Sequence, residues 1–205
     1  MIHLIGAGGH CKVVLDALLE GGVALADIRV RDGRADMAGR DLLGAVVETP
    51  EIAPVLSGHS FHIAIGAAAV RQRLHAEAEA AGGIAHTVRH PAAGVSRFAE
   101  IGDGSLVAAF AVVGPGVRIG RSVIVNHGAV IDHDCKIGNF VHLAPSCSLG
   151  GSVTVGARCL IGAGAVVLPG LSIGDDVTVG AGAVVTRDIA SNQTWTGIPA
   201  APKAL

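Results

Sequence analysis

An aliphatic residue recurs at every sixth position of the long stretch from Val95 to Ile189, without a break in register. Glycine is the commonest residue at the position that follows, and a small or apolar residue stands four places further on. A six-residue period is typical of a parallel β-helix. Each hexad supplies a short strand and a corner, so three hexads complete one triangular coil whose aliphatic side chains point inward. Coils of this kind stack at strand spacing, about 4.8 Å.

Polar residues that interrupt this repeat are candidates for chemistry. Asn126 and Asp132 stand where glycine is expected, His127 and His133 follow them on neighbouring faces, and His142 comes shortly after. A histidine beside a carboxylate makes a suitable general base, because its ordinary pKa lies near working pH. The alternative is that these histidines are surface residues of an exposed prism.

The three-hexad coil predicts that His133 lies against Gly151 on the next coil. The Gly151 backbone amide is then placed to stabilise an oxyanion, so that base and amide bracket a carbonyl group under attack. A different interpretation is a zinc site built from three histidines between subunits, although the spacing does not clearly match such a site.

The residues ahead of the repeat alternate between predicted strands and helices, which indicates a small α/β layer with a parallel sheet. A ligand site in such a layer lies beyond the carboxyl ends of the strands. That edge collects residues 6–10, Asp32 and Gly66. The glycine-rich turn allows a phosphate to approach the amides of a helix N-terminus, although a plain tight turn has the same sequence. The expected strands are residues 2–5, 28–31, 61–65 and 84–88, and the expected helices are residues 9–20, 68–81 and a short one from Pro50.

The sequence divides into an α/β domain (1–90), a β-helix (91–190) and a C-terminal segment (191–205) that caps the last coil, with Trp195 over its open end. We expect Cys135, Cys147 and Cys159 to point inward as core residues. Cys11, at the start of a helix, is expected to be partly exposed.

Charge and hydropathy exclude several classes of partner. The formal net charge is −2, which argues against nucleic acid or an anionic membrane. Apolar runs are too short to cross a bilayer, and the N-terminus resembles no signal peptide. We therefore expect a cytoplasmic protein.

The whole chain resembles the bacterial nucleotide-sugar acetyltransferases of the sialic acid O-acetyltransferase and bacillosamine-pathway N-acetyltransferase type. The resemblance lies in residues 6–14, 64–66, 90–91, 126–138 and 197–200, together with the hexads. It implies a Rossmann-like N-terminal domain, a left-handed parallel β-helix and a homotrimer with acetyl-CoA bound between neighbouring prisms. No metal is implied.

The resemblance also implies roles for individual residues. His133 would be the general base and Asp134 would orient it, with Asp132 a rival on spacing alone. Gly151 would supply the oxyanion amide, and His142 would contact the thioester. Ala163 and Ala181 would line the path of the pantetheine, and Asn126 would contact the sugar. The residues implied to bind the nucleotide are Gly8, Gly9, His10, Asp32 and Gly66.

The expected reaction is therefore transfer of an acetyl group from acetyl-CoA to the amine of a UDP- or GDP-linked 4-amino-deoxy sugar. Two departures from the family fall in the nucleotide site: Gly33 replaces a frequent acidic residue, and residues 67–69 are all alanine. These departures leave the nucleobase open. The alternatives are an O-acetyltransferase of the sialic acid type, a trimeric zinc hydratase, and a sugar-nucleotide-binding protein without catalysis.

Overall fold

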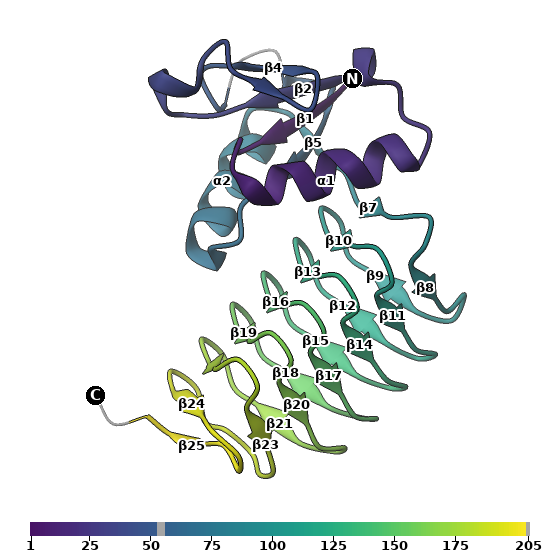
Figure 1. Cartoon of the computed structure of the whole chain (residues 1–205), viewed down its shortest axis with the longest axis vertical. Helices are drawn as coiled ribbons and strands as arrows, with labels where there is room; N and C mark the ends of the chain where they lie inside the picture. Colours follow the sequence, from purple (N-terminus) through teal and green to yellow (C-terminus); the bar gives the residue numbers. More distant parts are fainter. Residues whose placement is uncertain (53–55, 204–205) are drawn as a thin grey trace.

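The computed structural model describes residues 1–52 and 56–203 and consists of two parts (Figure 1). An α/β layer forms the N-terminal part, and a triangular β-helix extends away from it towards the C-terminus. Both expected architectures are confirmed, and the β-helix is left-handed. None of the helices in the described residues is long and apolar enough to span a membrane.

The N-terminal sheet is parallel apart from one hairpin, with strand order β3-β4-β2-β1-β5-β6. Two helices pack against it, and the predicted helix spans agree closely with those observed. The strands are β1 (Ile2–Ile5), β2 (Ile28–Arg31), β3 (Asp41–Leu42), β4 (Ala45–Glu48), β5 (Ser60–Ile63) and β6 (Ile84–Ala85), and the helices are α1 (Gly9–Glu20), α2 (Ala68–Ala80) and the short 3-10 turns η1 (Leu25–Asp27) and η2 (Ala35–Met37).

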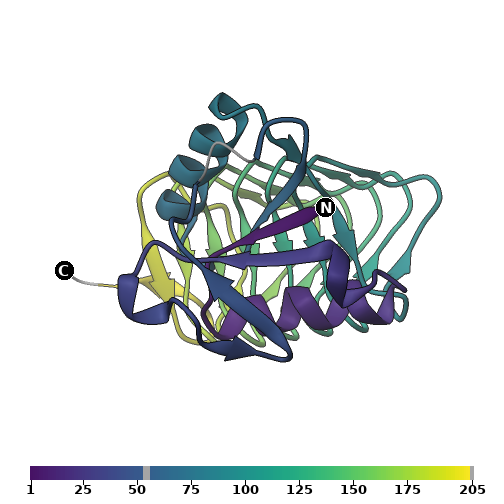
Figure 2. The same cartoon turned by 90° about the horizontal axis from the view of Figure 1, so that it is seen from above.

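Two separate cores hold this layer. One face of the sheet packs on α2 through Phe61 and Leu74. The other face packs on α1 and also on the β-helix, because Leu4 shares a core with Leu106 and Ile124. The two helices accordingly flank the sheet when it is seen from above (Figure 2).

Two details of the N-terminal part differ from the sequence prediction. Cys11 is fully buried instead of partly exposed, because it belongs to the face of α1 that packs on the sheet. Val88 does not extend the strand that begins at Ile84; it starts a separate strand, which pairs with the β-helix. The short helix expected from Pro50 runs through residues 53–55, which lie outside the described residues.

The β-helix has three faces, and each of its strands between residues 88 and 167 pairs with the strand three hexads further on, as Leu106 does with Ile124 and His142 with Leu160. The first face contains β7 (Val88–Arg89), β10 (Leu106–Val107), β13 (Ile124–Val125), β16 (His142–Leu143), β19 (Leu160–Ile161) and β22 (Thr178–Val179), followed by β24 (Thr194–Thr196) and β25 (Ala201–Pro202). The second contains β8 (Gly94–Val95), β11 (Val112–Val113), β14 (Val130–Ile131), β17 (Ser148–Leu149), β20 (Val166–Val167) and β23 (Val184–Val185), and the third β9 (Glu100–Ile101), β12 (Arg118–Ile119), β15 (Lys136–Ile137), β18 (Thr154–Val155) and β21 (Ser172–Ile173).

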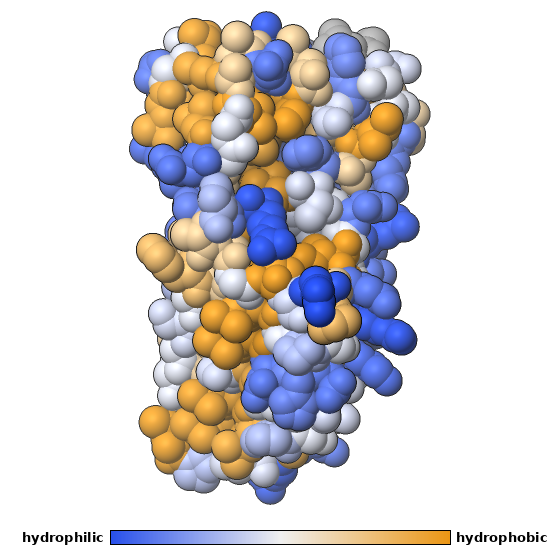
Figure 3. Space-filling model, turned by 90° about the vertical axis from the view of Figure 1, so that its right-hand side faces the viewer, coloured by the Kyte–Doolittle hydropathy of each residue, from blue (hydrophilic) through white to orange (hydrophobic). Residues whose placement is uncertain are grey.

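The interior of the prism is filled by the residues that the hexad pattern selects. Cys135, Cys147 and Cys159 are buried in this core, as predicted. Trp195 packs against the last coil from β24, which pairs with β22. On the face shown in Figure 3, hydrophobic side chains gather in patches on the left and centre of the prism, and hydrophilic side chains gather mostly on the right.

Candidate active site

His133 and Asp134 occupy the corner between the second and third faces. Asp134 Oδ2 lies 2.8 Å from His133 Nδ1, while Asp132 Oδ1 accepts the backbone N–H of His133 at 2.7 Å. The structure therefore separates the two carboxylates: Asp134 contacts the ring and Asp132 the backbone. With Nδ1–H donating to Asp134, Nε2 is left with a free lone pair. The same hydrogen bond raises the pKa of His133 above its ordinary value.

Nε2 of His133 lies against Gly151, as the three-hexad spacing predicts. A Cβ atom on Gly151 would lie 2.5 Å from Nε2, so only glycine fits beneath the ring in this position. The backbone N–H of Gly151 donates no hydrogen bond within residues 1–52 and 56–203. An imidazole base and an unengaged amide therefore lie side by side on adjacent coils.

Gly116 makes room for Asp134 in the same way, and the sequence analysis missed it. Asp134 has a left-handed backbone (φ 60°), which its short polar side chain tolerates. Its carboxylate then lies over the preceding coil, where a Cβ on Gly116 would lie 2.5 Å from Oδ1. Counting back three hexads from Asp134 identifies this glycine.

Asn126 and His142 form a second pair, on the first face. Asn126 Oδ1 accepts the N–H of His127, so the other end of the amide is its NH₂ group, which lies 3.2 Å from His142 Nε2. This arrangement makes Nε2 the acceptor and leaves the proton of neutral His142 on Nδ1. A Cβ on Gly66 would lie 3.8 Å from that Nδ1. His142 therefore presents a hydrogen-bond donor beside the Gly66 turn.

Burial keeps His142 and its neighbour His10 neutral. Burial, with a smaller effect from the Arg71 guanidinium, lowers the pKa of His142 to about 4. Burial also lowers the pKa of His10 to about 3, and the two rings lie 6.3 Å apart. Neither imidazole is a proton acceptor of ordinary strength at neutral pH, so both are suited to hydrogen bonding instead of base catalysis.

Arg71 joins the two parts of the molecule. Its side chain is fully buried, and burial lowers its pKa to about 10, so it stays charged at neutral pH. Its guanidinium donates only to backbone carbonyl groups, at Ile65 and Gly66 in the N-terminal part and at Ser122, Phe140 and Val141 in the β-helix. Arg71 thus fixes the Gly66 turn relative to the strand that carries His142.

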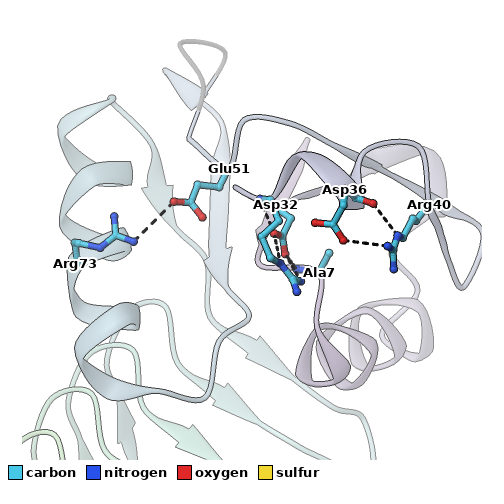
Figure 4. Close-up of polar contacts among 7 residues, drawn as sticks. Ala7, Asp32, Asp36, Arg40, Glu51 and Arg73 are labelled. Atoms are coloured by element: carbon cyan, nitrogen blue, oxygen red, sulfur yellow. Dashed lines mark hydrogen bonds and ion pairs between the residues drawn. The ribbon is translucent and has the colours of Figure 1, made fainter.

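A cavity of about 560 Å³ lies at the carboxyl edge of the N-terminal sheet, where the sequence predicts the nucleotide site. Its lining includes all five residues expected there, namely Gly8, Gly9, His10, Asp32 and Gly66, and also Arg34 and Glu51, which the sequence analysis missed. Figure 4 shows two of its lining residues, Asp32 and Glu51, with their polar contacts.

Asp32 is already engaged within this cavity. Its two carboxylate oxygens accept hydrogen bonds from the N–H of Ala7 and from the backbone and side chain of Arg34. The Arg34 guanidinium, above all, lowers the pKa of Asp32 to about 2. The guanidinium itself is 60 % exposed and faces the cavity. Asp32 therefore shapes the loop, and Arg34 is the charge available to a ligand.

Gly66 connects this cavity with a second one. The second cavity, of about 500 Å³, runs along the first face of the prism and is lined by Gly66, His142 and Leu160, among others. The two cavities meet where His10 and His142 lie close together. A ligand bound at the sheet edge therefore lies near the cavity that contains His142.

The remaining predicted residues lie on another edge of the prism. Ala163 and Ala181 are exposed and stacked on adjacent coils, with the N–H of Gly182 donating to Ala163 O, at the corner between the first and second faces. The second face is one hexad wide, which is at most about 20 Å at the rise per residue of a β-strand. His133 lies at its other end. One chain therefore does not bring His133 together with His142 and the two alanines. Within the described residues, no three His, Cys, Asp or Glu side chains are grouped as metal ligands.

The missed residues differ in how far the sequence could reveal them. Gly116 follows from the repeat alone. Arg34 stands shortly after a predicted strand end, but the sequence does not show that it pairs with Asp32. Glu51 and Arg71 reach their positions through tertiary packing, which no local pattern predicts.

Known protein families match the N-terminal part and the β-helix separately. Residues 1–78 match the PglD N-terminal domain. Residues 98–133 and 134–169 match the bacterial transferase hexapeptide (six repeats), and residues 152–187 match the hexapeptide repeat of succinyl-transferase. A search of curated proteins gave no match.

Solved structures match over nearly the whole chain. A variant of perosamine N-acetyltransferase from Caulobacter crescentus in complex with CoA and GDP-perosamine is 38% identical, with 99% of this chain and 96% of that chain covered and a TM-score of 0.92. The acetyltransferase domain of PglB from Neisseria gonorrhoeae in complex with acetyl coenzyme A is 36% identical, with 98% of each chain covered and a TM-score of 0.91. WeeI from Acinetobacter baumannii is 27% identical, with 99% of each chain covered and a TM-score of 0.88.

These matches cover both parts of the chain at once and agree with the expected family. They confirm an acetyltransferase, and they disfavour the zinc hydratase and the binding protein without catalysis. The chain belongs to the family of hexapeptide-repeat nucleotide-sugar N-acetyltransferases.

Proposed function

We propose that this protein transfers an acetyl group from acetyl-CoA to the amine of an amino sugar carried on a nucleoside diphosphate. The observation that carries the proposal is the stack of His133 on Gly151, with Asp134 on the far side of the ring. It occurs in a chain that is 38% identical to an N-acetyltransferase whose structure holds CoA and GDP-perosamine. We favour an amine over a hydroxyl acceptor for the same reason.

In this mechanism the neutral amine attacks the thioester carbonyl carbon, so that a C–N bond forms. The Gly151 N–H stabilises the oxyanion that develops. His133 Nε2 takes the proton from the amine nitrogen, and Asp134 stabilises the resulting imidazolium. When the C–S bond breaks, the imidazolium returns the proton to the sulfur, which leaves as the CoA thiol. CoA supplies the activated acetyl group, and the protein supplies orientation.

The residues on and beside the first face, together with the cavity at the sheet edge, position the two substrates. His142 Nδ1–H donates to the thioester carbonyl group, Ala163 and Ala181 line the path of the pantetheine, and Asn126 faces the sugar. Gly8 and Gly9 hold the diphosphate at the N-terminus of α1, where helix amides favour an anion. The other predicted nucleotide-site residues, His10, Asp32 and Gly66, line the same cavity.

A homotrimer completes the active site. His133 and Gly151 lie on one edge of the prism and His142, Ala163 and Ala181 on or beside the first face, so a neighbouring chain must supply one of the two halves. Exposed apolar residues on the outside of the prism, among them Val112, Val166 and Leu168, support packing of a second prism there. We also place the protein in the cytoplasm, since its four cysteines are all free.

The test measures CoA release from acetyl-CoA with GDP- and UDP-linked 4-amino-deoxy sugars. His133→Ala should lower kcat by about 10²-fold or more, which is the usual effect of removing a general base. His127→Ala is the matched control, because His127 occupies the equivalent place in the preceding hexad and is exposed. Unchanged turnover in His133→Ala rules out the base role, and acetylation of a hydroxyl analogue at an equal rate rules out the amine preference.

The oligomer is tested separately. Sedimentation should give three times the chain mass, and mixing His133→Ala with a variant in which His142 is replaced should restore part of the activity. Restoration occurs because some interfaces of the mixed trimer then contain both native halves. A fully active monomer contradicts the shared site.

A further inference from the structure

Glu51 places a carboxylate in the nucleotide cavity, close to Gly33. It lies after β4, and its side chain is 28 % exposed. Arg73 of α2 approaches it from outside, with Nη2 3.8 Å from Oε1, as Figure 4 shows. Arg73 thus holds the Glu51 carboxylate against the cavity wall.

The missing side chain at Gly33 is what allows this position. A Cβ on Gly33 would lie 2.7 Å from Glu51 Oε2 and 2.9 Å from its Cδ. Any other residue at position 33 would therefore displace the carboxylate.

The other charged groups of the cavity are committed elsewhere. Both oxygens of Asp32 already accept hydrogen bonds from Ala7 and Arg34. The Arg34 guanidinium and the amides at the start of α1 are positive and suit the diphosphate. Glu51 is thus the acceptor left for the uncharged part of the nucleotide, the base.

A carboxylate accepts hydrogen bonds and donates none, so it discriminates among nucleobases. Guanine presents two adjacent donors, N1–H and the N2 amino group, which match the two oxygens of a carboxylate. Uracil presents one N–H between two carbonyl oxygens, and one of these would face the negative charge. Cytosine and adenine place a ring acceptor beside their amino group, with the same penalty.

We propose that Glu51 reads the nucleobase and that the sugar carrier is guanosine diphosphate. This inference rests on the proposed function, because it assumes that the cavity holds the nucleotide of the acceptor substrate. Gly33 is then a second specificity residue, since it leaves the space in which Glu51 lies.

Calorimetric titration of the full-length protein with GDP, IDP and UDP tests the assignment. Wild-type protein should bind GDP more tightly than IDP, which lacks the N2 amino group, and more tightly than UDP. Glu51→Gln should weaken GDP binding about 10- to 100-fold, the usual effect of a charged hydrogen bond, and remove the difference between GDP and IDP. Glu77→Gln is the matched control: Glu77 also pairs with Arg73, at 2.7 Å, and does not line the cavity.

Gly33→Ala provides a second variant without touching Glu51. Because the clash is with the end of a flexible side chain, the carboxylate should move with little loss of stability, and the preference for GDP over UDP should fall. Equal affinity of wild-type protein for UDP and GDP, or unchanged GDP binding in Glu51→Gln, overturns the inference.

Acetyl-transfer assays distinguish failure of the Glu51 assignment from failure of the proposed function. Faster acetylation of a UDP-linked than of a GDP-linked amino sugar leaves the proposed function standing and refutes the role of Glu51. Absence of transfer to any nucleotide-linked amino sugar refutes the proposed function itself.

Discussion

His133 Nε2 and Gly151 are in contact across two adjacent coils, and a methyl group on Gly151 would lie 2.5 Å from that nitrogen. The imidazole side chain is 54 % exposed, so it can turn outward without disturbing the core. The position of the imidazole is therefore more sensitive to this glycine than the fold is.

Gly151→Ala should lower kcat about 10²-fold, because a shift of about 1 Å in a catalytic group has this effect. The melting temperature should change little. Gly94→Ala is the control, since a Cβ there meets only ordinary contacts at 3.9 Å. The contact matters less than proposed if kcat and KM of Gly151→Ala equal those of the wild type.

Asp134→Asn should shift the acid limb of the kcat profile to lower pH. The Asp134 hydrogen bond raises the pKa of His133, and a general base is active only when it is deprotonated. Removing the carboxylate lowers that pKa, so the active form appears at lower pH, while its weaker basicity reduces the plateau. Asp132→Asn is the comparison variant: the Asp132 carboxylate bonds the His133 backbone N–H and raises the His133 pKa less than the Asp134 hydrogen bond does, so the acid limb should move less. An acid limb that stays in place in Asp134→Asn would show that another group controls it.

The repeat explains why much of this site was predictable. A strict period turns sequence separation into spatial separation, so the contact of His133 with Gly151 follows from their spacing of three hexads, the same as that of the paired strands β14 and β17. The choice between Asp132 and Asp134 did not follow, because it depends on the left-handed backbone at Asp134. Periodicity gives the position of a residue on the prism, and it does not give the direction of a corner side chain.

The α/β part was predictable to a smaller extent. Alternating strands and glycines predicted the cavity at the carboxyl edge of the sheet, but the burial of Cys11 depends on the core that α1 shares with the sheet and the β-helix. The contacts of Arg71 with Phe140 join residues far apart in the sequence. Such contacts arise from the packing of one part on the other, which neither segment encodes alone.

Arg71→Met should destabilise the protein and impair binding of the nucleotide sugar. The variant leaves buried carbonyl groups without their donor, at a cost of roughly 3 kcal/mol in the free energy of unfolding. Since the Gly66 turn loses its anchor, KM for the nucleotide sugar should rise more than KM for acetyl-CoA. Arg71→Lys should recover part of both losses, because lysine restores a charge and some of the donors.

Arg40→Met is the control for Arg71. Arg40 forms an exposed pair with Asp36, as Figure 4 shows, and its loss should change stability by less than about 0.5 kcal/mol. Denaturant unfolding and the two KM values measure the effects. A uniform rise in both KM values for Arg71→Met would indicate general loosening without a specific positioning role.

Acid should destabilise the protein in two separate steps. Burial lowers the pKa of His62 and of His142 to about 4 from an ordinary value of 6.5. Between these values the unfolded chain binds protons that the folded chain does not, so the free energy of unfolding falls as pH decreases from 6.5 to about 4. For fully buried His62 the loss is on the order of 3 kcal/mol. Protonation of Asp32 reduces the free energy of unfolding only below pH 3.8, the ordinary value from which its pKa is lowered to about 2.

Urea unfolding at pH 8, 7, 6 and 5 distinguishes these groups. We expect the free energy of unfolding to decline in the histidine window, below pH 6.5 and before any carboxylate protonates. His62→Gln should flatten the decline, because the side chain that takes up the proton in the unfolded chain is then absent. If the free energy of unfolding of the wild-type protein stays constant down to pH 5, these imidazoles can be protonated in the folded protein. That result would contradict the effect of their burial between the sheet and the β-helix.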